Sequence, residues 1–366
     1  MEIKVKTGRI LVYRVYDIGS EIDLDVVEAL FQDKKLKERF KLERKNKSLI
    51  ISRTPVSIQL GKIEIQLGSH RVMADLTAKV WHFGTLSLCF QIPITQGTSW
   101  LELVQNAAWL EKDEEIDQLA HLKAIEFQKD IATAITGATA WTMNEDYVIY
   151  FIQEFDGLNV PAAQLMDKVD IPALILAETK EFLSDSMKKN VLENRFQYSR
   201  DDLVVVDWNS ALVLEPGGSM DVPLVIEFAL NQLLEMRYYD DLLDQRLNTL
   251  YNEVVGKKRG LFSNKYSRLA EEAGQIYLEI SEIVENVENS FKTVGDFYLA
   301  TIFRASSQRF RFDDWQRSID DKLSNLAEVS KLLHSEVNES RNQMMEIIVI
   351  LLIGVEVIPL IFTHLF

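Results

Sequence analysis

The sequence has almost no cysteine. Cys89 is the only one among 366 residues, which excludes a disulfide framework and fits a reducing compartment. We interpret Cys89 as a small core residue of the apolar run 86–92 rather than as a nucleophile, because free cysteine usually behaves as a buried apolar residue. The five histidines show no metal-ligand spacing and a cysteine pair is absent, so we expect no metal site and no cofactor.

Catalytic motifs are missing as well. The sequence contains no GxSxG and no GxGxxG, and the segment 256–260 (GKKRG) lacks the spacing of a phosphate-binding loop. We therefore expect a protein that is not an enzyme. The catalytic alternative is a pair of carboxylates, Asp202 and Asp207, which could serve in acid–base chemistry or hold Mg²⁺. We favour a structural interpretation, in which Asp202 opens a strand and 207–209 forms a turn, since Asp and Asn favour turns.

Positive charge is scarce. There are 40 Lys and Arg against 56 Asp and Glu, which gives a net charge of −16. Such a chain is a poor general partner for nucleic acid, because phosphate contacts need a surplus of basic side chains. The run 34–47 is the exception, with a local charge of +6, and we interpret it as a solvated stretch. The alternative is contact with lipid headgroups or RNA, including the ribosome, through Lys34, Lys35, Lys37, Arg39, Lys41, Arg44, Lys45 and Lys47.

The first residues lack a targeting signal. The chain begins Met-Glu-Ile-Lys-Val-Lys, no apolar segment follows, and the stretch is not rich in Arg and Ser. We therefore expect most of the chain to stay in the compartment where it is made.

The C-terminal end is strongly hydrophobic. Residues 347–366 (IIVILLIGVEVIPLIFTHLF) would span roughly 30 Å as a helix, the thickness of a bilayer core. The sequence predicts a transmembrane segment over 345–366, hence a membrane protein with its bulk on the cytoplasmic side. The residues that define this segment are Ile347, Leu351, Gly354, Glu356 and Pro359. The alternative is a helix buried inside an assembly.

Two glutamates of this region are candidate contacts between copies of the chain. A carboxylate in mid-membrane costs at least ~2.5 kcal/mol, so Glu356 is expected to face a neighbouring helix. Glu346 stands ten residues earlier, which places it roughly 80° from Glu356 around the helix axis.

The distribution of apolar residues predicts an α+β fold with four regions. These are an N-terminal α/β region with a helical linker over 1–140, a second α/β unit over 141–222, a helical and coiled-coil hairpin over 223–344, and the C-terminal segment 345–366.

Strands dominate the two α/β units. In the first unit we expect strands at 9–17, 48–52, 56–67 and 71–94, a helix at 24–31, and a helical stretch at 98–135 capped by Thr98. In the second unit we expect a strand at 147–155, a helix at 172–187 and a strand pair at 203–214. The openings 12–24 and 147–160 are alike, which suggests duplicated β-α-β units.

The last third is helical. A long helix is expected over 223–251, followed by apolar residues at 3-4 spacing in 265–294 and again in 319–344. We predict an antiparallel hairpin of these two segments, joined through 295–316.

A family resemblance follows from the C-terminal residues. The segment 337–358 (VNESRNQMMEIIVILLIGVEVI) resembles the ending of the required-for-meiotic-nuclear-division family, also called domain of unknown function 155. Members end with a coiled-coil helix, an Arg, a Leu-Glu-Trp and a hydrophobic segment with an embedded Ile-Glu-Val. Arg341, Glu346 and 355–357 match this pattern, while Ile347 stands in place of the Trp.

The resemblance extends upstream. Two further segments are similar to bacterial members of the family: 202–216, which contains Asp207, Trp208 and Asn209, and 225–243. The similarity therefore covers about 200–366 and is poor over the first 140 residues. It implies a membrane-associated protein without known catalysis. Eukaryotic relatives include a mitochondrial inner-membrane protein that supports translation, but this chain shows no transit peptide.

These observations leave three hypotheses. The first is a membrane-anchored scaffold or tether that self-associates through its helical stalk. The second is a soluble cytosolic interaction protein whose C-terminal helix is buried in an oligomer. The third is an enzyme that uses Asp202 and Asp207. The sequence does not name a protein partner.

Overall fold

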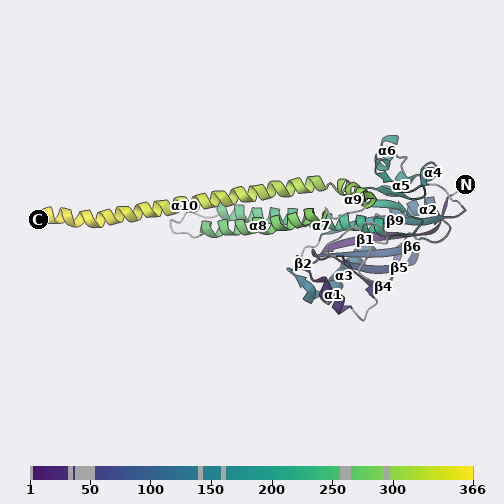
Figure 1. Cartoon of the computed structure of the whole chain (residues 1–366), viewed down its shortest axis with the longest axis horizontal. Coiled ribbons are helices and arrows are strands. Elements are labelled where there is room, and N and C mark those ends of the chain that lie inside the picture. Colours follow the sequence, from purple (N-terminus) through teal and green to yellow (C-terminus); the bar gives the residue numbers. More distant parts are fainter. Residues whose placement is uncertain are drawn as a thin grey trace. The chain divides into compact units, whose positions relative to one another are not determined.

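A computed structural model describes residues 3–31, 36–37, 54–138, 143–157, 162–255, 265–291 and 297–365. The chain forms two compact units. Unit 1 comprises 1–238 and 289–313, and unit 2 comprises 239–288 and 314–366. The α+β class is confirmed, because a large sheet occupies the N-terminal half and helices follow it (Figure 1).

The sheet of unit 1 contains ten strands among the described residues, in the order β10-β11-β12-β9-β1-β6-β5-β4-β3, with β7 also paired to β1. Only the β12–β9 pair is parallel within this described sheet. A separate two-stranded sheet pairs β2 with β8. The bounds are β1 (Lys4–Asp17), β2 (Glu21–Ile22), β3 (Leu36–Lys37), β4 (Val56–Leu67), β5 (His70–Val80), β6 (Thr85–Pro93), β7 (Thr98–Ser99), β8 (Ile135–Thr136), β9 (Asn144–Phe155), β10 (Arg195–Phe196), β11 (Leu203–Val206) and β12 (Ser210–Leu214).

A bulge in β4 is visible in the sequence pattern. Apolar residues occupy even positions up to Leu60 and odd positions from Ile63 onward. The register with β5 shifts at the same place, between Gln59 and Gly61. Gly61 has a φ of 107°, which favours glycine. One extra residue therefore reverses the facing of the strand without breaking it.

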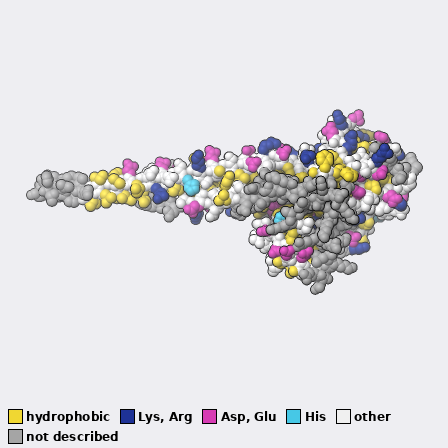
Figure 2. Space-filling model, viewed as in Figure 1, with side chains coloured by type: hydrophobic (Ala, Val, Ile, Leu, Met, Phe, Trp, Pro, Cys, Tyr) yellow, Lys and Arg dark blue, Asp and Glu magenta, His cyan; other side chains and the backbone are white. Residues whose placement is uncertain are grey.

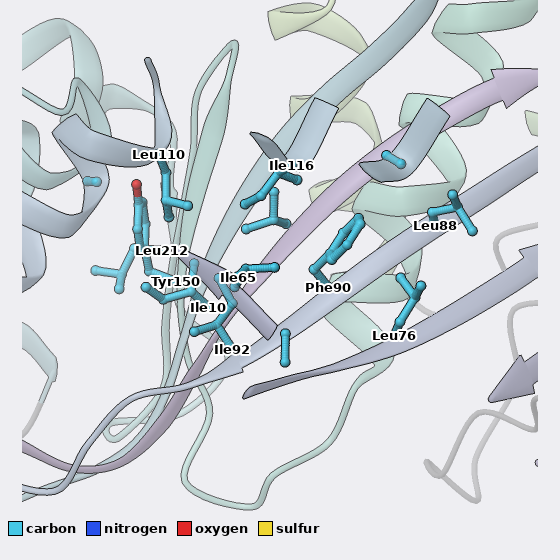
Figure 3. Packing of buried hydrophobic residues seen from close by; sticks show 14 of the residues in the cluster. Ile10, Ile65, Leu76, Leu88, Phe90, Ile92, Leu110, Ile116, Tyr150 and Leu212 are labelled. Atoms are coloured by element: carbon cyan, nitrogen blue, oxygen red, sulfur yellow. The ribbon is translucent and has the colours of Figure 1, made fainter. Parts of the chain in front are cut away.

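Six helices of the described part of the chain cover one face of the sheet. They are α1 (Leu24–Leu30), α2 (Trp100–Leu110), α3 (Glu115–Asp130), α4 (Ala162–Leu165), α5 (Ile171–Ile175) and α6 (Asp185–Glu193). Their buried residues form one apolar core with alternate residues of the strands, and Figure 3 shows part of it, including Ile10, Phe90, Leu110 and Tyr150. Burial of the apolar surface of these residues is the main contribution to the folding stability of unit 1.

Local signals explain two departures from the expected helices. The N-cap of α2 is Ser99 rather than Thr98, because Ser99 forms a reciprocal capping box with Glu102. The helix expected at 172–187 is wrong. It is two short helices, α5 and α6, separated where Ala177 has a φ of 52° and where the Glu178 side chain accepts hydrogen bonds from following backbone N–H groups.

The opposite face of the sheet carries the first part of α7 (Asp221–Val255) and α9 (Phe297–Arg309). Thr85 on β6 donates a hydrogen bond of 2.6 Å to Asn231 on α7. Aromatic rings continue the contact, with Phe228 lying 5.3 Å from Trp81 and 5.7 Å from Phe303 between ring centroids. These contacts place polar and aromatic side chains on a face opposite the apolar core.

Unit 2 is helical. It contains the rest of α7, most of α8 (Lys265–Phe291) and nearly all of α10 (Phe312–Leu365). The Lys322 ammonium lies 2.7 Å from carboxylate oxygens of both Asp240 and Asp244, which ties α10 to α7. The Ser330 hydroxyl donates to the Ala270 carbonyl at 3.3 Å, which ties α10 to α8.

Most residues of the expected packing stripes are buried where their side chains are described: Leu269, Ala273, Ile276, Ile280, Ile319, Leu323, Leu326 and Leu333. The end of the second stripe is not buried, because Val337 is half-buried and Met344 is 41% exposed. The segment expected to join the two arms is not a simple connection, because it contains α9, which belongs to unit 1.

The predicted membrane anchor is not supported. In the part of the chain that the structure describes, no helix has the length and apolar character needed to span a bilayer. The side chains of Glu356 and Pro359 lie outside the description. The predictions of a transmembrane segment at 345–366 and of membrane localisation are therefore wrong.

Candidate functional site

Asp202 is bound into a loop rather than exposed for chemistry. Its carboxylate accepts backbone hydrogen bonds from Tyr198, at 2.9 Å, and from Ser199, and a 3.1 Å hydrogen bond from the Tyr298 hydroxyl. Burial acts to raise the pKa of Asp202, but these hydrogen bonds outweigh it and hold the pKa below its ordinary value. Asp202 therefore stays ionised and fixes the turn before β11.

Asp207, Trp208 and Asn209 form the turn between β11 and β12. The Asp207 carboxylate lies 3.4 Å from the Arg309 guanidinium, and its backbone carbonyl accepts a 2.8 Å hydrogen bond from the Tyr147 hydroxyl. The Trp208 ring lies 6.4 Å from the Phe310 ring. Asp207 and Trp208 thus join the hairpin to α9 and to the residue after its C-terminal end.

Cys89 is buried on β6, and burial raises the pKa of its thiol to about 12. A thiol that stays protonated is a poor nucleophile. Among the described residues, no group of three or more His, Cys, Asp or Glu is arranged to hold a metal ion.

The basic run 34–47 lies outside the described residues, apart from the backbone of β3 at 36–37. The structure therefore gives no position for the side chains of the eight Lys and Arg residues of this run.

The far end of α10 exposes a continuous apolar surface. Ten large apolar side chains between Met344 and Val355 are each 41% to 70% exposed. Earlier in the same helix Leu326 and Leu333 are 0% and 3% exposed. Figure 1 shows α10 continuing beyond the ends of α7 and α8, and Figure 2 shows hydrophobic side chains gathered on this part of the helix. We call residues 341–355 the apolar arm.

Two opposite charges occupy the beginning of the apolar arm. Arg341 and Glu346 are exposed and form no ion pair with any described residue. Five residues separate them, whereas side chains on one helix meet at separations of three or four. Five is the separation between position g of one heptad and position e of the next, which pair between neighbouring helices of a coiled coil.

A polar cluster that sequence motifs do not reveal lies beneath α7. Glu227, on α7, forms a buried ion pair with Lys79 on β5, and Arg9 on β1 lines the same cavity. Positions 9, 79 and 227 are brought together only by the sheet order and by α7, so no short motif could identify them.

Comparison with known proteins adds a family but no activity. The family model described as "Uncharacterized protein MJ0711, N-terminal domain" matches residues 7–221, which run from β1 to the first residue of α7. The uncharacterized protein MJ0711 of Methanocaldococcus jannaschii is 20% identical over 215 residues, covering 58% of this chain and 65% of that protein. The match thus spans just under two thirds of this relative. No solved structure matches the chain.

These matches confirm only the coarser part of the resemblance drawn from the sequence, which is a family of unknown function. They do not carry the required-for-meiotic-nuclear-division name. They also fall on residues 7–221, whereas that resemblance rests mainly on residues 200–366.

Proposed function

Because the chain belongs to the family of the MJ0711 N-terminal domain, whose name records no activity, we propose a function from the structure itself: a non-catalytic assembly protein. Its apolar arm packs against the same arm of further copies of the chain. The α/β unit is then displayed by the assembly, where it can serve as a scaffold.

One observation carries this proposal, the exposure of the apolar arm on every side of its helix. Successive residues are ~100° apart around a helix, so the consecutive residues 347–353 point in all directions. Each of them is 42% to 63% exposed. A helix that is apolar all round is normally buried, and monomers rarely expose large contiguous apolar patches.

The charges of the apolar arm favour parallel copies as the occupant. In a parallel arrangement, Arg341 of one helix meets Glu346 of its neighbour, because positions g and e of successive heptads are neighbours across the interface. In an antiparallel arrangement of overlapping arms, the start of one arm lies beside the end of the other, so Arg341 and Glu346 of different copies would not meet. Closed symmetric homo-oligomers are the commonest soluble assemblies, which agrees with a self-complementary surface.

Hydrodynamic mass tests the proposal directly. We expect sedimentation velocity of the full chain to give an oligomer, and Leu352→Glu to shift it toward the monomer, because the variant places a charge in the apolar interface. Leu332→Glu is the matched control, since Leu332 is also exposed, at 60%, but lies outside the apolar arm. A monomeric wild-type chain across the micromolar range would contradict the proposal.

The segments 202–216 and 337–358 support a finer relationship, kinship with the required-for-meiotic-nuclear-division family. This kinship assigns no catalysis, which agrees with an assembly protein.

A further inference from the structure

A cavity of about 150 Å³ lies on the sheet face beneath the start of α7 in unit 1. Strands β1, β4, β5 and β6 form its floor, and Met220 and Glu227 close it from above. Arg9, Gln91 and Met220 are half-buried, so the cavity meets solvent at their end.

The strand register explains why this cavity is polar. On β6, Ser87, Cys89 and Gln91 alternate with the apolar residues Leu88 and Phe90, so all three point to the same face. Neighbouring strands continue the rows on that face. Ser87 pairs with Lys79 on β5, which pairs in turn with Ser57 on β4. Cys89 pairs with Tyr13 on β1 and with Thr77 on β5.

Two buried polar atoms of residues that line the cavity, Glu227 Oε1 and the Ser87 hydroxyl oxygen, have no hydrogen-bond partner among the described residues. Glu227 is 2% exposed, and its Oε1 makes no hydrogen bond, while Oε2 is paired with Lys79. Ser87 is 0% exposed, and its hydroxyl also lacks a partner. Buried polar groups are hydrogen-bonded in the great majority of cases, because an unmade bond costs ~1–3 kcal/mol.

The cavity also holds a positioned cation. The Arg9 guanidinium donates a 3.2 Å hydrogen bond to the Gln91 side-chain carbonyl and lies 5.8 Å from the centre of the Phe151 ring. These contacts occupy one N–H group and one face of the Arg9 guanidinium. Its other N–H groups can donate hydrogen bonds to a ligand. Lys79, Arg9 and the Glu227 carboxylate together give the cavity a formal charge of +1.

We propose that the cavity binds a small 2-hydroxycarboxylate monoanion. The ligand carboxylate accepts hydrogen bonds from Arg9, and the ligand hydroxyl donates to Glu227 Oε1 and accepts from the Ser87 hydroxyl. The ligand's single negative charge neutralises the cavity. An amino acid zwitterion carries no net charge and would leave the cavity with its charge of +1. A dianion would give the occupied cavity a net charge of −1.

The volume agrees with this class of ligand. A cavity of about 150 Å³ matches the engineered protein cavity of about 150 Å³ that binds benzene, so it has room for a ligand of roughly five to seven non-hydrogen atoms. Glycolate, lactate and glycerate have this size. The competing occupant is water alone, which would satisfy the same acceptors without selecting a carboxylate.

Calorimetric titration of the full chain separates these occupants. The probes are L-lactate, propionate, which lacks the hydroxyl, and 1,2-propanediol, which lacks the carboxylate. We expect saturable binding of lactate, and binding of propionate and propanediol weaker by about tenfold or more, because each loses a hydrogen-bonding group. Equal binding of lactate and propionate, or no binding of any probe, overturns the proposal.

Variants assign the contacts. Ser87→Ala should weaken lactate binding by about tenfold while leaving the unliganded melting temperature unchanged, because the Ser87 hydroxyl has no protein partner to lose. Arg9→Gln should abolish the preference for lactate over propanediol. Thr301→Ala is the matched control, since its hydroxyl bonds only within α9 at 2.9 Å. Unchanged lactate affinity in Ser87→Ala, with wild-type binding intact, contradicts the assigned site.

Discussion

Glu227 on α7 and Lys79 on β5 form an ion pair in which the carboxylate side chain is 1% exposed and the lysine side chain 13% exposed. The pair joins residues 148 positions apart and holds the start of α7 over the sheet. Two charges removed from water stabilise a fold only when each compensates the other. The pair therefore makes the position of α7 depend on both side chains.

Loss of one member of this pair should be costly. We expect Lys79→Met to lower the free energy of unfolding of unit 1 by about 3–5 kcal/mol, because Glu227 would remain buried without its counter-charge. The double variant Lys79→Met/Glu227→Leu should recover most of the loss. Urea unfolding followed by tryptophan fluorescence, to which the buried Trp81 contributes, measures both changes. Equal destabilisation in the single and double variants would rule out this coupling.

Local patterns predicted much of the sheet. The strands expected at 9–17, 56–67 and 147–155 correspond to β1, β4 and β9, and the turn at 207–209 between β11 and β12 follows from Asp and Asn preferences. The β4 bulge was not predicted, although a change of phase after Leu60 marks it. The apolar arm was also recognisable from residues 347–353, although its interpretation as a membrane span was wrong.

Long-range contacts were not predictable in the same way. The cavity depends on Arg9, Lys79 and Glu227, which only the strand order and α7 bring together. The break within 172–187 depends on Ala177 adopting a left-handed conformation, which its side chain does not favour. The pairing of Asp240 and Asp244 with Lys322 depends on the packing of α10 against α7.

The stability of unit 1 should fall as pH rises from about 5 to 7. Burial raises the pKa of Glu145 from 4.5 to about 7, although the neighbouring Arg237 acts to lower it. Between these values the folded chain retains a proton that the unfolded chain has lost, so the free energy of unfolding decreases with increasing pH. Asp17, whose pKa burial raises to about 7, contributes in the same direction.

Replacement of Glu145 measures how much this residue contributes to the pH dependence of stability. Glu145→Gln should reduce the loss of stability between pH 5 and 7.5 by up to about 3 kcal/mol, because it removes one of the titrating groups. Urea unfolding at both pH values measures this change. Glu154→Gln is the control, since the Glu154 side chain is 53% exposed, and equal slopes in wild type and Glu145→Gln would contradict the assignment.

The stability of the helix packing in unit 2 should depend on Lys322. Burial acts to lower the pKa of Lys322, but hydrogen bonds and charge from Asp240 and Asp244 outweigh it and raise the pKa above the ordinary value. Lys322→Met should destabilise the helix packing by about 1–3 kcal/mol, because hydrogen bonds between charged groups are lost. Backbone hydrogen exchange in α10 should accelerate in this variant and not in Lys331→Met, an exposed lysine of the same helix. Unchanged exchange in both variants would show that the ion pairs contribute little.

The assembly account rests on parallel apolar arms, and an exchange of charges tests this most directly. Sedimentation velocity should show that Arg341→Glu and Glu346→Arg each weaken association, because like charges then meet across the interface. The double variant Arg341→Glu/Glu346→Arg should restore the wild-type oligomer, since the opposite pairing is re-formed. A double variant that associates no better than the single variants, or single variants that match the wild type, would contradict the parallel arrangement.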